Sequence, residues 1–212
     1  MLGINARPKV AKVLAPVVTW LLRAGITADV VTVLGTLGAV GGAAGLIATG
    51  HLFWGAFAVT LFVLLDMLDG ALARAQGGGS LYGAVLDSTG DRAADAAIFG
   101  ALVWWFSGGG HNRLLVLLAL LCLVLGVLTS YIKARAEGVG LSGDVGIVER
   151  AERLILVLTG TGFAGLGVPY ALHVALWILL AGSAVTVAQR ILLVRRTGRG
   201  RTAQVPVVPP VP

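Results

Sequence analysis

Six long apolar runs constrain this chain more than any other feature of its sequence. An α-helix needs about 20 predominantly apolar residues to cross about 30 Å of hydrocarbon. These runs are too long and too continuously apolar for the strands of a membrane barrel, and short polar or glycine-rich breaks separate them. They cover residues 28–49, 52–74, 84–106, 113–134, 147–167 and 170–194. We therefore predict an all-α integral membrane protein with six transmembrane helices.

The composition agrees with a membrane protein. Hydrophobic residues make up 57% of the chain and charged residues only 12%, whereas soluble domains carry about 25% charged residues. The net charge is +6. In a chain this apolar, such a charge indicates an anionic membrane surface or an anionic substrate, and we expect no nucleic-acid partner.

The two ends of the chain differ from the apolar middle. Segment 1–26 interleaves basic with apolar residues, which predicts an amphipathic interfacial helix. Segment 197–212 is first basic and then proline-rich, and we expect it to be disordered. The six-helix transmembrane domain is predicted to span residues 27–196. The basic residues that would face lipid headgroups near the N-terminus are Arg7, Lys9, Lys12 and Arg23.

The distribution of charge predicts the orientation in the membrane. If the six helices alternate, only Arg113 of the 16 Lys and Arg residues falls on one side, and the other 15 lie at or near the opposite face. The positive-inside rule makes that basic face cytoplasmic, so both termini are expected in the cytoplasm. The acidic residues lie on the same side. We therefore predict a multi-pass protein of the cytoplasmic membrane whose chemistry faces the cytoplasm.

Four aspartates at the ends of two neighbouring runs mark a candidate site. Asp66 and Asp69 are three residues apart, Asp87 and Asp91 are four apart, and each pair therefore shares one helix face. The glycine-rich turn 76–80 joins the two helices and should bring the pairs together. Four carboxylates that share one cavity in a membrane are either partly protonated or compensated by cations. An all-oxygen donor set suits Mg²⁺ or Mn²⁺ rather than Zn²⁺, and two ions would clamp the oxygens of a phosphoryl group.

Two other uses of these acids stay open. They could form interhelical ion pairs that only hold the bundle together, although Arg74 and Arg92 are the only cations close to them in sequence. They could also form the ion path of a divalent-cation transporter. The acids crowd one membrane face and none continues toward the other, which disfavours a transport path.

The full pattern is Asp66-x2-Asp69-Gly70-x2-Ala73-Arg74-x8-Gly83-x3-Asp87-x3-Asp91. It resembles the signature of the CDP-alcohol phosphotransferases, integral membrane enzymes of phospholipid synthesis. The resemblance implies a six-helix fold, two Mg²⁺ ions (or Mn²⁺) and a homodimer. It also implies residue roles: Asp66, Asp69, Asp87 and Asp91 as metal ligands, Asp91 also as the catalytic general base, Gly70 as the place where the nucleotide approaches the helix, Arg74 as the partner of the diphosphate, and Ser80 as a nucleotide contact.

The stretch TADVVT, residues 27–32, carries a second resemblance. Read from the residues alone, Thr27 is an N-cap candidate and Asp29 lies in the first helical turn. The family often shows T-P-N-x-x-T here, so Ala28 replaces proline and Asp29 replaces asparagine. The resemblance implies that the nucleotide pocket is lined by Asp29, Val30, Val31 and Thr32.

The donor implied by the resemblance is CDP-diacylglycerol, whose acyl chains can stay among the membrane lipids. The chain looks closest to the bacterial members that make phosphatidylinositol phosphate, with inositol 1-phosphate as acceptor; glycerol 3-phosphate is the alternative acceptor. A phosphorylated acceptor needs a basic cluster, which a neutral polyol does not. The candidates for this cluster are Lys133, Arg135, Arg150, Arg153 and Arg190. Each of them could instead make an ordinary contact with lipid phosphates.

Overall fold

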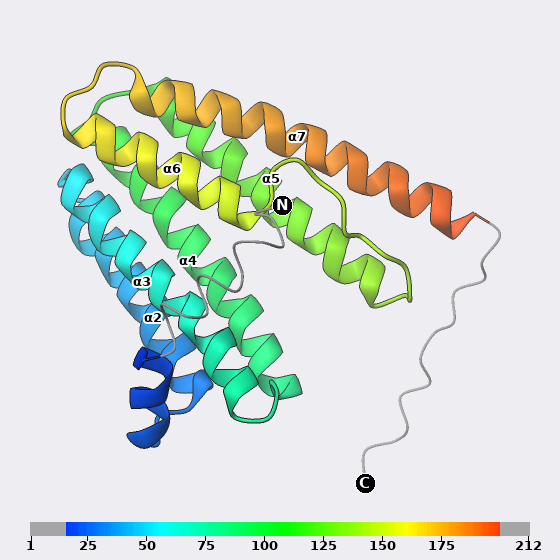
Figure 1. Ribbon diagram of the computed structural model, residues 1–212. Coiled ribbons are helices and arrows are strands. Elements are labelled where there is room, and N and C mark those ends of the chain that lie inside the picture. Colours follow the sequence, from blue (N-terminus) through cyan, green and yellow to red (C-terminus); the bar gives the residue numbers. More distant parts are fainter. Residues whose placement is uncertain (1–15, 200–212) are drawn as a thin grey trace, which may run out of the picture.

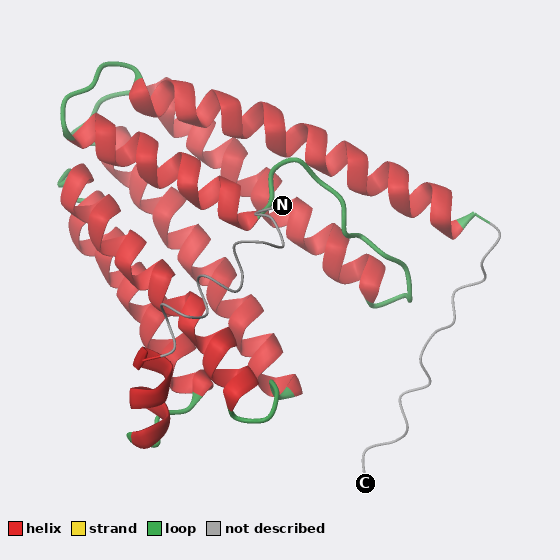
Figure 2. Ribbon diagram, viewed as in Figure 1, coloured by secondary structure: helices red, strands yellow, loops and turns green. Residues whose placement is uncertain are grey.

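The computed structural model describes residues 16–199, apart from the side chains of Asp66 and Met67, and this part of the chain is helical without strands (Figures 1 and 2). Each of the six predicted runs corresponds to one long helix, with ends that shift by a few residues. A short helix over residues 16–23 comes first. It is followed by α2 (Ala28–Gly42) with its π-helical continuation η1 (Ala43–Ile47), α3 (Leu52–Ala75), α4 (Leu81–Ser107), α5 (Arg113–Glu137), α6 (Arg150–Gly165) and α7 (Ala171–Gly198).

Side-chain caps explain where several of these helices begin. Thr27 caps α2, where its hydroxyl accepts a hydrogen bond from the amide of Val30 at 3.4 Å, and this confirms its prediction as an N-cap. Asn112 caps α5 in the same way, through the amide of Leu115. Such caps satisfy backbone donors that have no partner inside the helix.

Four helical segments are long and apolar enough to cross a membrane: Ala28–Ile47, Leu52–Ala75, Arg113–Glu137 and Ala171–Gly198. They confirm the prediction of a multi-pass membrane protein at this coarser level. The other two helices fall short for physical reasons. The N-terminal half of α4 carries several charged side chains, and α6 has only 16 residues. Six membrane crossings therefore stay a prediction.

The packing places α2 at the centre of the N-terminal half. It lies against both α3 and α4, while α5 packs against α4 and α7, and α6 packs against α3 and α7 (Figure 1). The main core draws on every helix from α2 to α7, and it includes Phe99, Leu118 and Leu176. Cys122 is a buried member of this core, as its apolar surroundings in the sequence indicate.

The helix over residues 16–23 packs beside the aspartate-bearing part of α3. Its Val18 and Leu21 join a small core with Leu68 and Leu72, whereas Trp20 is exposed. This helix therefore buries one face and exposes another, as the predicted amphipathic segment requires. Its placement on a membrane surface stays a prediction.

Both predicted end segments extend partly beyond the described residues. Arg7, Lys9 and Lys12 lie outside the described range, and so does the tail from residue 200 onward. Helix α7 continues to Gly198. The segment predicted to be disordered from residue 197 therefore begins inside a helix, because the apolar periodicity of α7 ends before its hydrogen-bonded turns do.

Candidate active site

Asp69 of α3 is tied to the start of α2 by a short hydrogen bond. The Thr32 hydroxyl donates to Asp69 Oδ2 at 2.5 Å, and both side chains are buried. This contact brings together the TADVVT stretch and the aspartate motif, which lie 37 residues apart. A hydrogen bond of this kind holds a carboxylate in one orientation, as ligands of metal ions are commonly held.

Asp29 lies against the start of α4. A Cβ added at Gly83 would stand 3.0 Å from Asp29 Oδ1 and 3.1 Å from Ser80 Oγ, so the glycine of the motif makes room for the Asp29 carboxylate. Ser80 is the N-cap of α4, where its hydroxyl accepts from the amide of Gly83 at 2.8 Å. This capping role is established by the geometry, and its nucleotide contact stays a prediction.

The other two residues of the predicted nucleotide segment point in different directions. Val31 is buried in the small core that also contains Leu68 and Leu72, whereas the side chain of Val30 is exposed. A pocket beside α2 would therefore be lined by Asp29 and Thr32 rather than by the side chain of Val31.

Little of the described structure lies beside Gly70. Among the described side chains outside its immediate neighbours, a Cβ added there would have only Arg74 Nη1 nearby, at 3.5 Å. The guanidinium of Arg74 thus borders a free surface of α3 next to Asp69. Such an arrangement suits a diphosphate, because glycine allows a close approach to the helix backbone and an arginine fork can bind phosphate oxygens.

Asp91 of α4 is neutralised by arginines from two helices. Arg150 Nη1, at the start of α6, lies 2.7 Å from Asp91 Oδ1, and Arg92 Nη2 lies 3.6 Å from Asp91 Oδ2. Arg74 and Arg92 are the cations closest to the acids in sequence, but Arg150 reaches Asp91 from a distant part of the chain. Distance along the chain is a poor guide here, because the loop before α6 returns the start of that helix to α4.

Asp95, one helical turn further along α4, is a site residue that the sequence reasoning missed. Its Oδ2 lies 2.6 Å from Arg153 Nη2, and both residues are almost completely buried. Gly126 of α5 makes room for this pair, since a Cβ there would lie 3.1 Å from Arg153 Nη1. The signal that could have found Asp95 is the continued four-residue spacing after Asp87 and Asp91.

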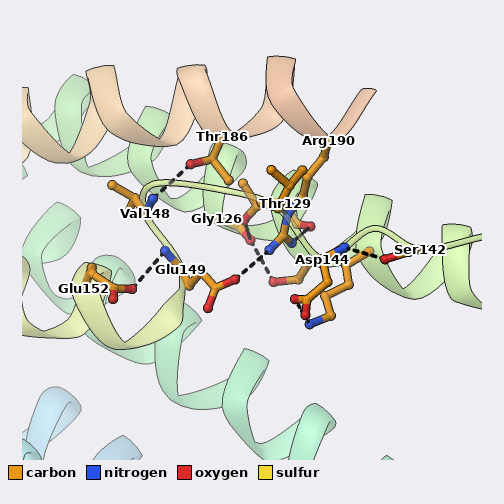
Figure 3. Close-up of polar contacts among 12 residues, drawn as sticks. Gly126, Thr129, Ser142, Asp144, Val148, Glu149, Glu152, Thr186 and Arg190 are labelled. Atoms are coloured by element: carbon orange, nitrogen blue, oxygen red, sulfur yellow. Dashed lines mark hydrogen bonds and ion pairs between the residues drawn. The ribbon is translucent and has the colours of Figure 1, made fainter. Parts of the chain in front are cut away.

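Arg190 of α7 is also buried, but it contacts the segment before α6 rather than the aspartates (Figure 3). Its Nη1 donates to the Thr129 carbonyl at 2.5 Å and its Nε to the Val145 carbonyl at 2.8 Å. Its Nη2 lies 3.5 Å from Glu149 Oε1. Arg190 therefore links α5, α7 and the segment that leads into α6.

Lys133 and Arg135 lie at the C-terminal end of α5. Lys133 Nζ lies 2.7 Å from Asp144 Oδ1, and this hydrogen bond lowers the pKa of Asp144 below its ordinary value. Arg135 is exposed. The contacts thus divide the five predicted basic residues into three groups. Arg150 and Arg153 face Asp91 and Asp95. Lys133 and Arg190 hold the segment between α5 and α6, and Arg135 lies at the surface.

The aspartates have the chemistry of a divalent-cation site. Their donors are all carboxylate oxygens, which Mg²⁺ and Mn²⁺ prefer. Among the described side chains, no three acidic, histidine or cysteine groups converge as metal ligands, and the side chain of Asp66 lies outside that description. The four motif aspartates therefore fit the cation by donor type, and their joint coordination stays a prediction.

A family model described as CDP-alcohol phosphatidyltransferase matches residues 25–188, which include the whole aspartate motif and the basic residues up to α7. The chain belongs to this family. Membership in the CDP-alcohol phosphatidyltransferases makes the protein a transferase and confirms the resemblance inferred from its signature. It also removes the support for a divalent-cation transporter.

Relatives within the family are similar over nearly their whole length. A phosphatidylinositol phosphate synthase of Mycobacteroides abscessus is 52% identical over 196 residues, covering 92% of this chain and 89% of the relative. One of Streptomyces avermitilis is 47% identical over 203 residues, covering 92% and 83%. The likeness thus extends well beyond the motif.

Solved structures of a CDP-alcohol phosphatidyltransferase relative share the fold. The phosphatidylinositol phosphate synthase of Mycobacterium tuberculosis with CDP-DAG bound aligns with a TM-score of 0.82 at 50% identity, covering 86% of this chain and 94% of that one. The same enzyme in complex with manganese and citrate aligns with a TM-score of 0.81 at 51% identity, covering 85% and 88%.

Proposed function

We propose that this CDP-alcohol phosphatidyltransferase transfers the phosphatidyl group of CDP-diacylglycerol to a hydroxyl of inositol 1-phosphate, releasing CMP. The names of its relatives support this acceptor, and the CDP-DAG complex of the M. tuberculosis enzyme supports the donor. The observation that carries the proposal is the contact between Arg150 and Asp91 at 2.7 Å. It puts a phosphate-binding guanidinium directly beside the group proposed as the general base.

The local charge favours a phosphorylated acceptor. Three arginines (Arg92, Arg150 and Arg153) surround two aspartates (Asp91 and Asp95), which leaves one net positive charge. A phosphate group would be attracted to this positive charge, whereas an uncharged polyol would leave it without a partner. Arg150 is the leading phosphate ligand because it is less buried than Arg153. In this proposal Arg153 completes the basic surroundings of the pocket through its contact with Asp95. Lys133 and Arg190 act indirectly by holding the segment that leads into α6, and Arg135 is a proposed pocket residue at the surface.

The nucleotide end of the donor is assigned to the free surface beside Gly70. Arg74 would pair with the diphosphate there. The other side chains proposed to line this nucleotide pocket are those of Asp29, Val30, Thr32 and Ser80, whereas Val31 belongs to the small core.

Divalent cations, Mg²⁺ or Mn²⁺, would be held by Asp66, Asp69, Asp87 and Asp91. Such ions neutralise the diphosphate and polarise the phosphorus that is attacked. The protein holds Asp69 in place through Thr32. The manganese complex of the M. tuberculosis relative supports this assignment, and two ions per site are part of the proposal.

The reaction requires one proton transfer and one displacement. Asp91 takes the proton of the acceptor hydroxyl, whose oxygen then bonds to the β-phosphorus of CDP-diacylglycerol. The bond from that phosphorus to the oxygen bridging the two phosphates breaks, and CMP leaves with the bonding electrons. The arginines hold the acceptor in line, so most of the rate enhancement comes from positioning and charge stabilisation.

The proposed setting is the cytoplasmic membrane, with six crossings and the aspartates facing the cytoplasm. The excess of Lys and Arg on the aspartate-bearing side supports this orientation. A homodimer is part of the same proposal and rests on the family resemblance alone.

An acceptor panel tests the proposal. Purified protein with CDP-diacylglycerol and Mg²⁺ is given inositol 1-phosphate, inositol or glycerol 3-phosphate, and CMP release is measured. We expect turnover with inositol 1-phosphate only. Turnover with glycerol 3-phosphate alone would show that glycerol 3-phosphate, and not inositol 1-phosphate, is the acceptor substrate.

Asp91→Asn should abolish turnover while CDP-diacylglycerol still binds. Full activity in that variant would remove Asp91 from its role as base.

A further inference from the structure

Three residues of α7, four positions apart, form a stripe on which the segment before α6 lies. They are Gly182, Thr186 and Arg190, called here the docking stripe. Segment 145–149, the last part of the connection between α5 and α6, lies against Thr186 and Arg190 (Figure 3). Residues four apart share one helix face, so a single side of α7 makes all of these contacts.

Two glycines allow the close approach. A Cβ added at Gly146 would lie 2.4 Å from Thr186 Cγ2, and one added at Gly182 would lie 2.5 Å from Val148 Cγ2. Both distances are too short for real Cβ contacts. The backbone of the segment at Gly146, and that of α7 at Gly182, therefore lie directly against side chains of the opposite element.

The Thr186 hydroxyl takes part in two hydrogen bonds, one as acceptor and one as donor. It accepts a hydrogen bond from the Val148 amide at 3.1 Å and donates to the Gly182 carbonyl at 2.9 Å. Thr186 is completely buried. Without that hydroxyl, the Val148 amide would lose its acceptor in a site that water does not reach, and an unpaired buried donor is costly.

The docked segment leads directly into the acceptor side of the site. Glu149 is the N-cap of α6 and forms a capping box with Glu152. The next residue is Arg150, which contacts Asp91, and Arg153 follows one turn later. Because a helix turns by about 100° per residue, a slip of one position at the N-cap would rotate both arginines away from the aspartates.

We propose that Thr186, together with Gly146 and Gly182, is a positioning residue for acceptor binding. It touches no substrate and acts through the start of α6, whose place and rotation it determines. This inference rests on the proposed function in one respect, namely that Arg150 and Arg153 bind the phosphate of the acceptor.

The first test compares three single variants. Thr186→Val keeps the shape of the side chain and removes its hydroxyl, whereas Thr186→Ser keeps the hydroxyl. We expect Thr186→Val to raise the KM for inositol 1-phosphate about tenfold, equivalent to about 1.4 kcal/mol, with little change in kcat or in the KM for CDP-diacylglycerol. Thr186→Ser should stay close to the original enzyme. The control is Thr161→Val, because Thr161 is also buried and its hydroxyl donates to Val157 within α6.

Either of two results overturns the proposal. One is an equal rise of both KM values in Thr186→Val, and the other is the same acceptor defect in Thr161→Val. Both would show a general loss of structure rather than a displaced acceptor site.

The second test does not depend on the acceptor. Hydrogen–deuterium exchange over residues 145–153 should become faster in Thr186→Val than in the original protein, in Thr186→Ser or in Thr161→Val. Unchanged exchange overturns the proposal. If the acceptor panel instead selects glycerol 3-phosphate, the proposed function is revised, and the KM comparison is made with that acceptor. A failure of the proposed function, seen in the acceptor panel, is therefore distinguishable from a failure of this inference, seen in the exchange rates.

A double substitution tests the contact itself. Gly146→Ala should raise the acceptor KM, because the new Cβ would strike Thr186 Cγ2. Thr186→Ser removes that methyl group, so the defect of Gly146→Ala should be smaller in the Thr186→Ser background. Strictly additive defects would contradict a direct contact between the two positions.

Discussion

Arg153 of α6 and Asp95 of α4 form an ion pair that is buried on both sides, with 2.6 Å between Nη2 and Oδ2. The two residues are 58 positions apart. Charges removed from water in this way need close partners, and losing one partner leaves the other exposed to the full desolvation cost. The pair therefore joins α4 to α6 beside the proposed acceptor site.

Asp95→Asn should destabilise the protein strongly. The substitution leaves the Arg153 guanidinium buried without a close opposite charge, and we expect a loss of about 3 kcal/mol. Thermal unfolding of the purified protein in detergent measures it. The comparison is Asp144→Asn, which removes the exposed partner of Lys133 and should change the melting temperature little. Similar shifts in the two variants would contradict a special role for the buried pair.

Gly126→Ala should weaken acceptor binding more than it weakens the fold. The added Cβ would lie 3.1 Å from Arg153 Nη1, so the guanidinium must shift. We expect the KM for the acceptor to rise several-fold, because small displacements of positioning groups affect binding and rate. Gly100→Ala in α4 is the matched control, since a Cβ there meets no atom of the described residues within 4 Å. An unchanged KM in Gly126→Ala would show that the arginine has room to move.

Thr32→Val should raise the Mg²⁺ concentration needed for half-maximal activity. It removes the hydroxyl that orients Asp69, and loss of such a partner typically weakens metal binding by about tenfold or more. Thr32→Ser should retain the original requirement. Thr60→Val serves as control, because its hydroxyl donates to the Ala56 carbonyl in its own helix. Equal Mg²⁺ titrations in all variants would exclude Thr32 from this role.

Gly70→Ala should give a stable but poorly active protein. Among the described side chains outside its immediate neighbours, only Arg74 lies near a Cβ added at Gly70, and alanine is favoured over glycine within a helix by up to about 1 kcal/mol. The melting temperature should therefore stay the same or rise. The KM for CDP-diacylglycerol should increase, because the new methyl group occupies the surface assigned to the nucleotide. Gly41→Ala, at another open position, should leave this KM unchanged.

Removal of divalent cations should abolish CMP release. The aspartates of the motif would then repel the diphosphate that they are proposed to bind through metal ions. Activity is measured after chelation with EDTA and again after adding Mg²⁺ or Mn²⁺, either of which should restore it. Full turnover in EDTA would refute a metal-dependent site.

The sequence by itself determined the helices, the family and the motif. Apolar runs of membrane length locate the six long helices to within a few residues, because burial of a continuous apolar surface depends on local composition. The helical repeat alone places Asp66 and Asp69 on one helix face, and Asp87 and Asp91 on another. The Thr27 cap is equally local. None of these inferences depends on which helices become neighbours.

Only the tertiary structure decided which charges meet. It paired Arg150 with Asp91 and Arg153 with Asp95, and it directed Arg190 toward the segment before α6. Five basic residues at helix ends look alike in the sequence. Their partners depend on how α4, α5, α6 and α7 are rotated and packed against one another, and contacts such as those at Gly126 and Gly146 set that packing through long-range shape rather than through any local pattern.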